Sequence, residues 1–400
     1  MSSPSAADII ATLDGISHGS FNGNEVERLK VRAAARRLLA RVESPYERAW
    51  GFCFEQPIVS AALQTTIDVG LWKAWTDAGG GEKSIDELVK LTSPEVETNL
   101  LRRLFRLLAA FNVVDESGVD KFKPTPFSQA IGDEKTKVRA SLEANNNQYC
   151  LASHNLPKYL QKISYVEPTV TDENNHSQSD PDGLNFFARL QATPKYYADF
   201  TGHMEAWTAW KTPWTKIYDP SRLLDGAIVT TDAPLVVDVG GNTGIDISHV
   251  LTELPDLPAG CLVLQDLPEI IAKAKETVDS RITAMAHDFF TEQPVKGARA
   301  YFMHAVLHDW PLAEATKLLR NTRDAMTRGY SKLFVYDIVL PEQGASISQT
   351  VMDVNMMSLL SAKERTRGDW ESLLKGAGFS VVKFYEDPQG YEMLIEADVC

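Results

Sequence analysis

The first part of the chain has the hydrophobic pattern of helices. In residues 24–63 apolar side chains recur three and four positions apart, which predicts helices that each bury one face, with interruptions at Pro45 and Pro57. Residues 84–131 then predict two short helices, the first opened by a capping box with Ser84 as N-cap, followed by a small β-ribbon at the turn "ESG". This order of helices and ribbon is typical of a winged-helix unit.

Two segments in the middle of the chain differ in polarity. Residues 166–183, "VEPTVTDENNHSQSDPDG", are polar and acidic and contain proline, so we expect an exposed loop between helices. Residues 195–214, "KYYADFTGHMEAWTAWKTPW", are unusually aromatic. This second segment fits either the aromatic core of a helical layer or the lining of a site for a flat organic ligand.

After Pro234 the pattern changes to short apolar runs that alternate with stretches of helical length. Four of these runs look like buried strands, at residues 235–241, 261–266, 299–306 and 332–340. Repeated strand and helix units of this kind predict an α/β fold with a parallel, doubly wound sheet. Ligands of such sheets bind beyond the carboxyl ends of the strands, so acidic residues and glycines at those ends are the candidate site residues.

The charge of the chain argues against nucleic acid as a partner. Its 400 residues include 40 Lys and Arg against 54 Asp and Glu, a formal net charge of −14, and no polybasic run that could contact a phosphate backbone. Arg102, Arg103 and Arg106 lie on the second helix of the expected winged-helix unit, but that helix is otherwise rich in Leu and Phe. A DNA-binding regulator is therefore the weaker alternative.

The cysteines and the apolar stretches bear on the compartment. Four cysteines are scattered along the chain without C-x-x-C spacing, which favours reduced thiols in a cytosolic compartment over a disulfide framework. The sequence shows neither a signal peptide nor an apolar stretch long enough to span a bilayer. We therefore expect a cytoplasmic protein without a membrane partner.

The strongest chemical signal is the loop "DVGGNTG", residues 238–244, at the end of the first expected strand. Its glycines allow backbone N–H groups to approach a ligand closely, although the loop matches neither the P-loop nor the dinucleotide motif G-x-G-x-x-G. Asp266 ends the second strand, where it can accept hydrogen bonds from two ribose hydroxyls, and Asp288 with Phe289 offers a carboxylate and a flat apolar flank. Each acid alone is more often a helix cap or a surface residue. The three in order favour a nucleoside ligand without phosphate.

Five motifs follow one another along the chain: "DVGGNTG", "LQDLP", "HDFF", "HDW" and the tail "KERTRGDWESLLKGAGF". They resemble the S-adenosylmethionine-dependent class I O-methyltransferases of the plant caffeate and flavonoid type, including their fungal relatives in secondary metabolism. The resemblance covers almost the whole chain. It implies an α/β fold with a C-terminal Rossmann-like, doubly wound methyltransferase domain and an N-terminal, mainly helical, winged-helix-like dimerisation domain.

The resemblance also implies domain limits and a cofactor site. Residues 1–135 would form the dimerisation domain, residues 136–230 a helical connector that contributes to the substrate pocket, and residues 231–400 the catalytic domain, with S-adenosylmethionine as cofactor. His304 lies at a cofactor-side position where the family often has Lys. The other residues implied are Asp238, Gly240, Gly241 and Gly244 for the methionine portion, Asp266 and Leu267 for the ribose, and Asp288 and Phe289 for the adenine.

The stretch "YFMHAVLHDW", residues 301–310, carries two histidines four positions apart. A hydrolytic zinc site would place Glu directly after the first histidine, where this chain has Ala, so we expect no metal. By the resemblance His308 is the base that takes a proton from the acceptor hydroxyl. A phenol with a pKa near ~10 is mostly protonated at neutral pH, whereas an imidazole with a pKa of about 6.5 can accept its proton. Asp337 and Glu364 are both candidates for orienting the imidazole, and the choice between them stays open.

The acceptor pocket is expected to be aromatic and rich in Met, because flexible Met side chains can clamp a planar ring. The candidates are Asn146, Asn147, Phe200, Met204, Trp207, Trp210, Trp310, Met352, Asn355 and Met356. The preferred function is methylation of a hydroxyl (phenol, enol or N-hydroxyl) of an aromatic secondary metabolite such as an alkaloid or polyketide, by a homodimer. The alternative is a pericyclase or dehydratase that keeps the fold and the cofactor without methyl transfer.

Overall fold

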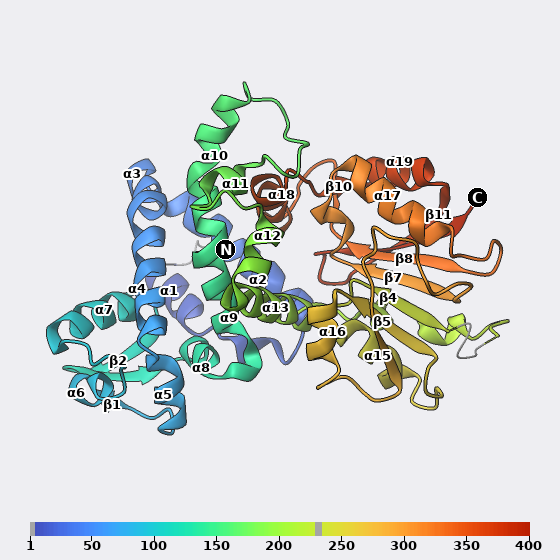
Figure 1. Ribbon diagram of the computed structural model, residues 1–400. Helices are drawn as coiled ribbons and strands as arrows, with labels where there is room; N and C mark the ends of the chain where they lie inside the picture. Colours follow the sequence, from blue (N-terminus) through green and yellow to red (C-terminus); the bar gives the residue numbers. More distant parts are fainter. Residues whose placement is uncertain (1–4, 229–233) are drawn as a thin grey trace. The chain divides into compact units, whose positions relative to one another are not determined.

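The computed structural model describes residues 5–228 and 234–400, which belong to two compact units, residues 1–59 and 60–400 (Figure 1). The described part of the first unit is built of helices: α1 (Ala6–Asp14), η1 (His18–Phe21), α2 (Glu25–Val42), α3 (Pro45–Trp50), η2 (Gly51–Glu55) and the start of α4 (Gln56–Asp68). The interruption expected at Pro45 is confirmed, because α3 begins there with Ser44 as its N-cap. The interruption expected at Pro57 is wrong. There the π-helical η2 leads directly into α4, and a proline without an N–H is tolerated in the first turn.

The second unit begins with a small mixed layer. Its elements are α5 (Leu71–Asp77), β1 (Lys83–Ser84), α6 (Ile85–Val89), α7 (Thr98–Ala110), β2 (Val114–Gly118), β3 (Lys121–Pro124) and α8 (Pro126–Gly132), with the strands in the order β1-β3-β2. The capping box at Ser84 is confirmed. Phe105 of α7 is fully buried against the rings of Trp72, Trp75 and Phe122. The two helices and the antiparallel ribbon of a winged-helix-like unit are therefore present. The turn expected at "ESG" is wrong by two positions, because residues 116–118 belong to β2 and the turn lies at Val119 and Asp120.

A helical layer follows, with α9 (Val138–Ala144), η4 (Asn145–Tyr149), α10 (Cys150–Lys162), α11 (Asn175–Ser179), α12 (Phe186–Ala192), α13 (Pro194–Ala209) and α14 (Trp214–Ile217). The exposed loop expected at residues 166–183 is only partly correct, because Asn174, Asn175 and His176 are buried. The Asn175 amide donates to Ala152 O at 2.8 Å and to Ser358 O at 2.9 Å. A short polar segment can thus be buried where it satisfies main-chain carbonyls.

The C-terminal part is built on a seven-stranded sheet in the order β11-β12-β8-β7-β4-β5-β6. Only β12 runs antiparallel to its neighbours. The strands are β4 (Val236–Val239), β5 (Leu262–Asp266), β6 (Ile282–Ala286), β7 (Ala300–His304), β8 (Lys332–Asp337), β11 (Phe379–Glu386) and β12 (Met393–Val399). The four strands expected from the sequence are confirmed, and β6, β11 and β12 are additional.

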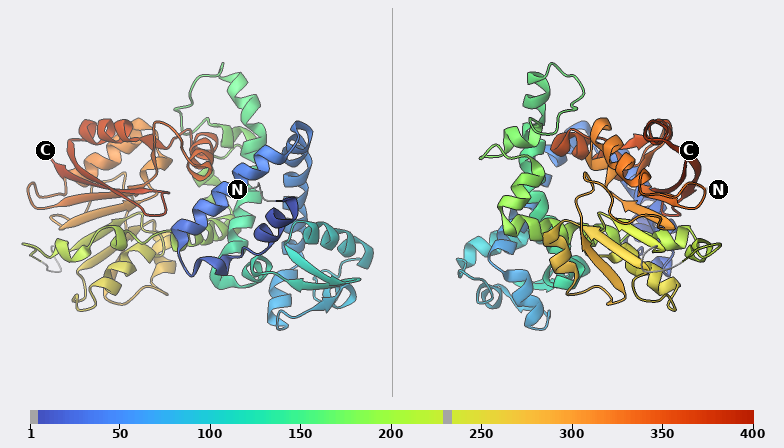
Figure 2. Two further views of the ribbon diagram at one scale, coloured as in Figure 1. Left: turned by 180° about the vertical axis from the view of Figure 1, so that it is seen from behind. Right: turned by 45° about the vertical axis from the view of Figure 1, so that its right-hand side comes forward.

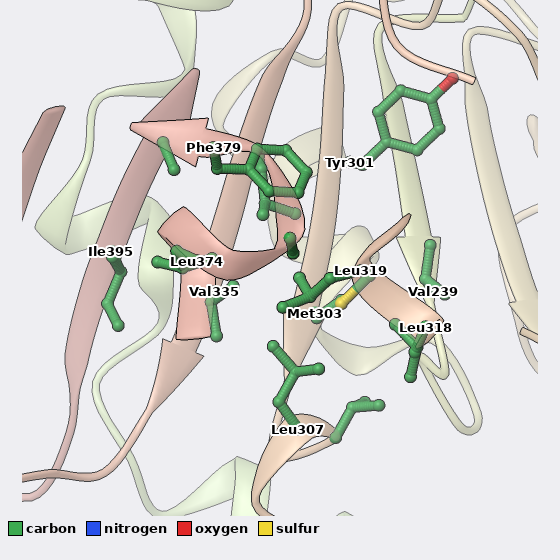
Figure 3. Packing of buried hydrophobic residues seen from close by; sticks show 14 of the residues in the cluster. Val239, Tyr301, Met303, Leu307, Leu318, Leu319, Val335, Leu374, Phe379 and Ile395 are labelled. Atoms are coloured by element: carbon green, nitrogen blue, oxygen red, sulfur yellow. The ribbon is translucent and has the colours of Figure 1, made fainter. Parts of the chain in front are cut away.

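Helices cover both faces of this sheet, as Figure 1 and Figure 2 show. α15 (Ile245–Glu253) and α16 (Pro268–Ala274) pack on one face, and α17 (Leu312–Arg323) and α19 (Arg367–Ala377) on the other. In Figure 3 side chains from strands and from α17 and α19 form one apolar cluster, including Val239, Met303, Val335, Leu318 and Leu374. The remaining elements are η3 (Glu134–Thr136), η5 (Pro220–Leu223), η6 (Leu307–Asp309), β9 (Val339–Leu340), α18 (Ile347–Leu360) and β10 (Arg365–Thr366).

The structure bears less directly on two other expectations. A search of the described helices finds none with the length and apolar character that crossing a membrane requires. The cytoplasmic location stays a prediction. The domain limits at residues 135 and 230 stay predictions as well.

Candidate active site

The larger of two neighbouring cavities in the second unit, about 310 Å³, lies at the carboxyl ends of β4, β5 and β7. β4 lies between the other two strands, so the strand order reverses there, which is where ligands bind in doubly wound sheets. The cavity is lined by the expected cofactor residues Gly240, Gly241, Asp266, Leu267, Asp288, Phe289 and His304, and by the expected acceptor residues Phe200, Met204 and Trp310. The structure therefore brings together residues that are up to about a hundred positions apart in the chain.

Asp238 and Gly244 support the glycine loop without lining the cavity. A Cβ atom on Gly241 would lie 2.4 Å from Asp238 Cγ and 2.6 Å from Leu264 Cδ1. Gly240 has a φ of 76°, and a Cβ atom there would lie 2.9 Å from Val306 Cγ2. These positions need glycine, because the loop passes close to side chains that are already packed. Asp238 is buried, and burial raises the pKa of its carboxyl well above its ordinary value.

Asp266 is held by backbone donors at the end of β5. Its Oδ2 accepts a hydrogen bond of 2.8 Å from Asn242 N, and its Oδ1 accepts one of 2.7 Å from Leu267 N. Burial raises the pKa of Asp266 to about 6 although these two donors favour the charged form. Each carboxylate oxygen has a second lone pair, so the fixed carboxylate can still accept hydrogen bonds from a ligand.

His304 ends β7 and lines the same cavity between two carboxylates. Its Nδ1 lies 2.7 Å from Asp246 Oδ2, and its Nε2 lies 3.2 Å from Glu392 Oε2. Burial alone would lower the pKa of His304, but the two carboxylates outweigh it and raise the pKa to about 10. With a carboxylate on each side, the protonated imidazole donates both N–H groups, and both of its nitrogens are satisfied within the protein.

The smaller cavity, about 30 Å³, adjoins the larger one, because Phe200, Met204 and Asp309 line both. His308 lines it from η6 (Leu307–Asp309). The other lining residues are Tyr149, Phe186, His203, Trp207, Met352, Met356, Leu359 and Leu360. The imidazole thus faces an apolar and aromatic space directly beside the cavity at the strand ends.

His308 is surrounded by three carboxylates. Its Nδ1 lies 2.8 Å from Glu364 Oε1 and 3.6 Å from Asp337 Oδ1, and its Nε2 lies 3.5 Å from Asp309 Oδ1. Of the two carboxylates that the sequence left open, Glu364 lies at hydrogen-bond distance from Nδ1 and Asp337 lies farther away. Which of them orients the imidazole stays a prediction. A carboxylate at hydrogen-bond distance favours a proton on Nδ1, and Nε2 is the nitrogen on the side of Asp309.

The protonation of this group differs from that of an ordinary imidazole. Burial lowers the pKa of His308, but Asp337, Glu364 and Asp309 outweigh it and raise the pKa well above its usual value. Burial raises the pKa of Asp337 and of Asp309 to about 6. The ligand atoms of His308, Asp337 and Glu364 lie within 4.8 Å of one another, a grouping that could also hold a metal ion. The 2.8 Å separation of Nδ1 and Oε1 has the length of a hydrogen bond, so we interpret the group as one that holds a proton.

Several expected acceptor residues do not line either cavity. Asn146, Asn147, Asn355 and Trp210 are absent from both linings, and their substrate contacts stay predictions. Sequence reasoning missed Phe187, whose ring stacks on Trp310 at 5.5 Å between centroids, and Tyr149. It also missed the acids Asp246 and Asp309. Asp309 had a signal, since it directly follows His308 in the "HDW" motif.

Comparison with known proteins gives the family of the chain. A family model described as O-methyltransferase domain matches residues 223–380. O-methyltransferase ATR12 of Stachybotrys chlorohalonatus is 41% identical over 395 residues, which cover 99% of this chain and 99% of that protein. The chain belongs to the O-methyltransferases, in their fungal secondary-metabolism branch. Its cofactor is S-adenosylmethionine, and the resemblance inferred from the motifs is confirmed.

Solved structures agree with this fold. LepI in complex with SAM matches with a TM-score of 0.89 and 25% identity, covering 99% of this chain and 100% of that one. OxaC in complex with SAH and oxaline matches with a TM-score of 0.84 and 26% identity, covering 98% of each chain. The α/β fold class, with its helical N-terminal region, is confirmed by these matches.

The larger cavity fits S-adenosylmethionine. Asp266 offers fixed acceptor oxygens for the ribose hydroxyls, and Phe289 offers a flat apolar face for the adenine. None of the described residues that line the cavity is Lys or Arg, so no cationic side chain there is placed to pair with a phosphate, which suits a nucleoside cofactor without phosphate. Gly240 and Gly241 of the loop line the same cavity, and the absence of their side chains leaves the backbone open to a ligand.

Proposed function

We propose that the enzyme methylates a hydroxyl (phenol, enol or N-hydroxyl) of an aromatic secondary metabolite such as an alkaloid or polyketide, with His308 as general base. The observation that carries the proposal is the 2.8 Å hydrogen bond between His308 Nδ1 and Glu364 Oε1 beside the cofactor cavity. It engages Nδ1, so Nε2 is the nitrogen that would take the proton of an acceptor hydroxyl in the smaller cavity, which His308 and Asp309 both line.

When bound, the cofactor supplies an electrophilic methyl group on its sulfonium. The acceptor oxygen must lie in line with that group, and the side chains of Phe200 and Met204, which line both cavities, are placed to hold it there. In the transfer the acceptor oxygen would bond to the methyl carbon while the bond from that carbon to sulfur breaks and leaves its electron pair on the departing S-adenosylhomocysteine. His308 Nε2 would accept the proton of the acceptor hydroxyl. Glu364 and Asp337 then stabilise the imidazolium, while the aromatic walls keep water out.

The walls support an aromatic acceptor that carries oxygen atoms. The stacked rings of Phe187 and Trp310 and the thioethers of Met352 and Met356 offer flat and adaptable apolar contacts. The indole Nε1 atoms of Trp207 and Trp310 are buried and have no hydrogen-bond partner among the described residues. Buried N–H donors are costly without a partner, so an acceptor with carbonyl or ether oxygens suits them.

The test of the proposal compares His308→Ala with the wild type. The acceptor would be the small molecule that co-purifies with the protein, identified by mass spectrometry. We expect the turnover to fall by about 10² to 10⁴, the usual contribution of a general base, while the affinity for S-adenosylhomocysteine stays unchanged. His154→Ala, which removes an exposed histidine of α10, is the matched control and should leave turnover unchanged. Methyl transfer by His308→Ala at the wild-type rate over a full pH series would refute the role of His308.

A second candidate function rests on one structural neighbour. A solved structure described as "A Pericyclic Reaction enzyme" matches with a TM-score of 0.89 and 25% identity over 98% of this chain and 99% of that one. A pericyclic or dehydration reaction would consume no methyl donor. Formation of S-adenosylhomocysteine in equal amount to the product would exclude it, and a product without the added methyl mass would support it.

We also propose that the enzyme is a homodimer joined through its first unit. Residues 5–59 expose many large apolar side chains: Ile9, Ile10, Leu13, Ile16, Val31, Leu39, Val42, Tyr46, Trp50, Phe52, Phe54 and Ile58. Apolar exposure on this scale is typical of a surface that a partner covers. An isologous contact between two copies would bury it.

A further inference from the structure

A chain of four alternating charges runs through the interior of the second unit. Asp246 Oδ2 lies 2.7 Å from His304 Nδ1, and His304 Nε2 lies 3.2 Å from Glu392 Oε2. The other oxygen of Glu392 accepts a hydrogen bond from the ammonium group of Lys211. Asp246 belongs to α15 and His304 to β7, Glu392 directly precedes β12, and Lys211 is the second residue after the end of α13. The chain therefore ties the cofactor loop to the helix that lines both cavities.

All four side chains are shielded from water. Their exposed fractions are 10% for Asp246, 5% for His304, 1% for Glu392 and 2% for Lys211. The two anions and the two cations cancel, so the four side chains together are neutral. Removing any one member would leave an uncompensated buried charge, which is strongly destabilising. The Lys211 ammonium also lies 3.7 Å from the centre of the Trp207 ring, which lines the smaller cavity.

Of the two ends of this chain of four charges, only the Asp246 end presents a carboxylate to the cofactor cavity. Asp246 lines that cavity next to the glycine loop, and its Oδ2 is taken by His304. Its Oδ1 makes no hydrogen bond to any residue that the structure describes. His304 also lines the cavity, but both of its nitrogens are engaged by carboxylates. It therefore cannot donate to the carboxylate of a bound amino acid, which is the contact a lysine at this position could make.

We propose that Asp246 receives the ammonium group of the cofactor's methionine portion, and that the buried charges from His304 to Lys211 are positioning residues that hold its carboxylate in place. Asp246 lines the cavity with one oxygen engaged by His304 and the other without a hydrogen-bond partner among the described residues, and such a carboxylate is suited to a charge-assisted hydrogen bond with a ligand. The proposal rests on the cofactor alone. It needs neither the acceptor nor the role of His308.

The test compares two ligands by calorimetric titration. S-adenosylhomocysteine carries the amino acid portion, and 5′-methylthioadenosine lacks it. Asp246→Asn should bind S-adenosylhomocysteine about 10- to 100-fold more weakly, as expected for the loss of a hydrogen bond between charged groups, with its affinity for 5′-methylthioadenosine unchanged. Asp266→Ala, on the ribose side, should weaken the binding of both ligands. Equal effects of Asp246→Asn on the two ligands, or no effect on either, would overturn the proposal.

A measurement on the wild type avoids any doubt about folding of the variant. An analogue of S-adenosylhomocysteine in which hydrogen replaces the amino group should lose most of the affinity in the wild type. In Asp246→Asn the same replacement should cost little, because the partner of the amino group is already absent. An analogue that binds the wild type as tightly as S-adenosylhomocysteine does would contradict the assignment.

The positioning role has its own test. Lys211→Met and Glu392→Gln each leave an uncompensated charge. Each should weaken the binding of S-adenosylhomocysteine and leave the binding of 5′-methylthioadenosine unchanged. The double variant restores neutrality around the remaining pair of Asp246 and His304, so it should recover much of the lost affinity. If the loss of binding free energy in the double variant equals the sum of the losses in the two single variants, the charges act independently. That result would refute the positioning role of the four coupled charges.

Discussion

The imidazole of His308 and the carboxylate of Glu364 are joined by a hydrogen bond of 2.8 Å between Nδ1 and Oε1, with both side chains almost fully buried. Asp337, at 3.6 Å from the same nitrogen, is too distant to share this bond equally. Of the two carboxylates, Glu364 is therefore the one placed to hold a proton on Nδ1, and Asp337 lies near enough to act on the imidazole through its charge.

The first prediction ranks the two carboxylates. Glu364→Gln removes the charge that faces the protonated Nδ1 and should lower turnover by about 10- to 100-fold, the usual loss when the partner that orients a histidine is removed. Asp337→Asn should lower turnover less, because its oxygen lies 0.8 Å farther from Nδ1, at 3.6 Å against 2.8 Å. Single-turnover rates of methyl transfer give the ranking. A larger loss of turnover in Asp337→Asn than in Glu364→Gln would show that Glu364 is not the carboxylate that orients His308.

The second prediction concerns pH. A general base works in its deprotonated form, so the rate rises as pH increases through the pKa of His308. Since the three carboxylates raise this pKa well above its ordinary value, the midpoint of the rise should lie above about 6.5. Asp309→Asn removes one of these carboxylates and should move the midpoint to lower pH. A midpoint that does not move in this variant would mean that another group controls the profile.

The third prediction concerns Asp266 and the cofactor. Burial raises its pKa to about 6, and the charged form is the better acceptor for two ribose hydroxyls. The affinity for S-adenosylhomocysteine should therefore fall as pH decreases through about 6, because the carboxyl gains a proton there. Asp266→Ala should bind more weakly by about 1.5 to 3 kcal/mol and lose this pH dependence. Calorimetry at several pH values tests both expectations, and an unchanged pH dependence in the variant would contradict them.

Part of the fold could be predicted because its signals are local. The strands that form β4, β5, β7 and β8 are continuous apolar runs, and each ends in or near a residue with obvious chemistry. The strands β6 and β11 lie at the two edges of the sheet and bury few residues, so they lack such a run. In β12 the buried Glu396, paired with Lys332 at 3.1 Å, interrupts the apolar pattern.

The parts of the site that were missed depend on contacts across the chain. Asp246 meets His304 58 positions away, and Glu392 meets it 88 positions away. Nothing in the residues next to these acids distinguishes them from surface carboxylates. The same holds for Asn175, which reads as part of a polar loop but is buried because Ala152 O and Ser358 O accept its amide hydrogens. Motif residues such as Asp266 were predictable because each stands at the end of an apolar strand run within a recognisable local motif, although one of the donors to Asp266, Asn242 N, lies 24 positions away.

The fourth prediction tests the dimer. Trp50 and Phe54 lie on neighbouring turns with ring centroids 4.6 Å apart, and both are about half exposed. Replacing both with Glu should place two charges in an apolar contact and convert a dimer to a monomer, which sedimentation at micromolar concentration detects. Glu27→Lys and Arg32→Glu, polar positions of α2, serve as charge-changing controls. A wild type that sediments as a monomer would refute the dimer.

The fifth prediction compares two glycines. A Cβ atom on Gly241 would lie 2.4 Å from Asp238 Cγ and 2.6 Å from Leu264 Cδ1, distances at which packed atoms must move. Gly241→Ala should therefore lower the free energy of unfolding by about 1 to 3 kcal/mol and weaken the binding of S-adenosylhomocysteine, since the loop is displaced.

Gly376→Ala is the matched control, because Gly376 lies exposed in α19 with no heavy atom within 4 Å of an added Cβ. That change should raise the free energy of unfolding by about 1 kcal/mol, because Ala favours the helix, and leave cofactor binding unchanged. Urea unfolding gives the free energy of unfolding of both variants. Equal values for the two would show that the glycine loop tolerates a side chain and that close packing does not require glycine at position 241.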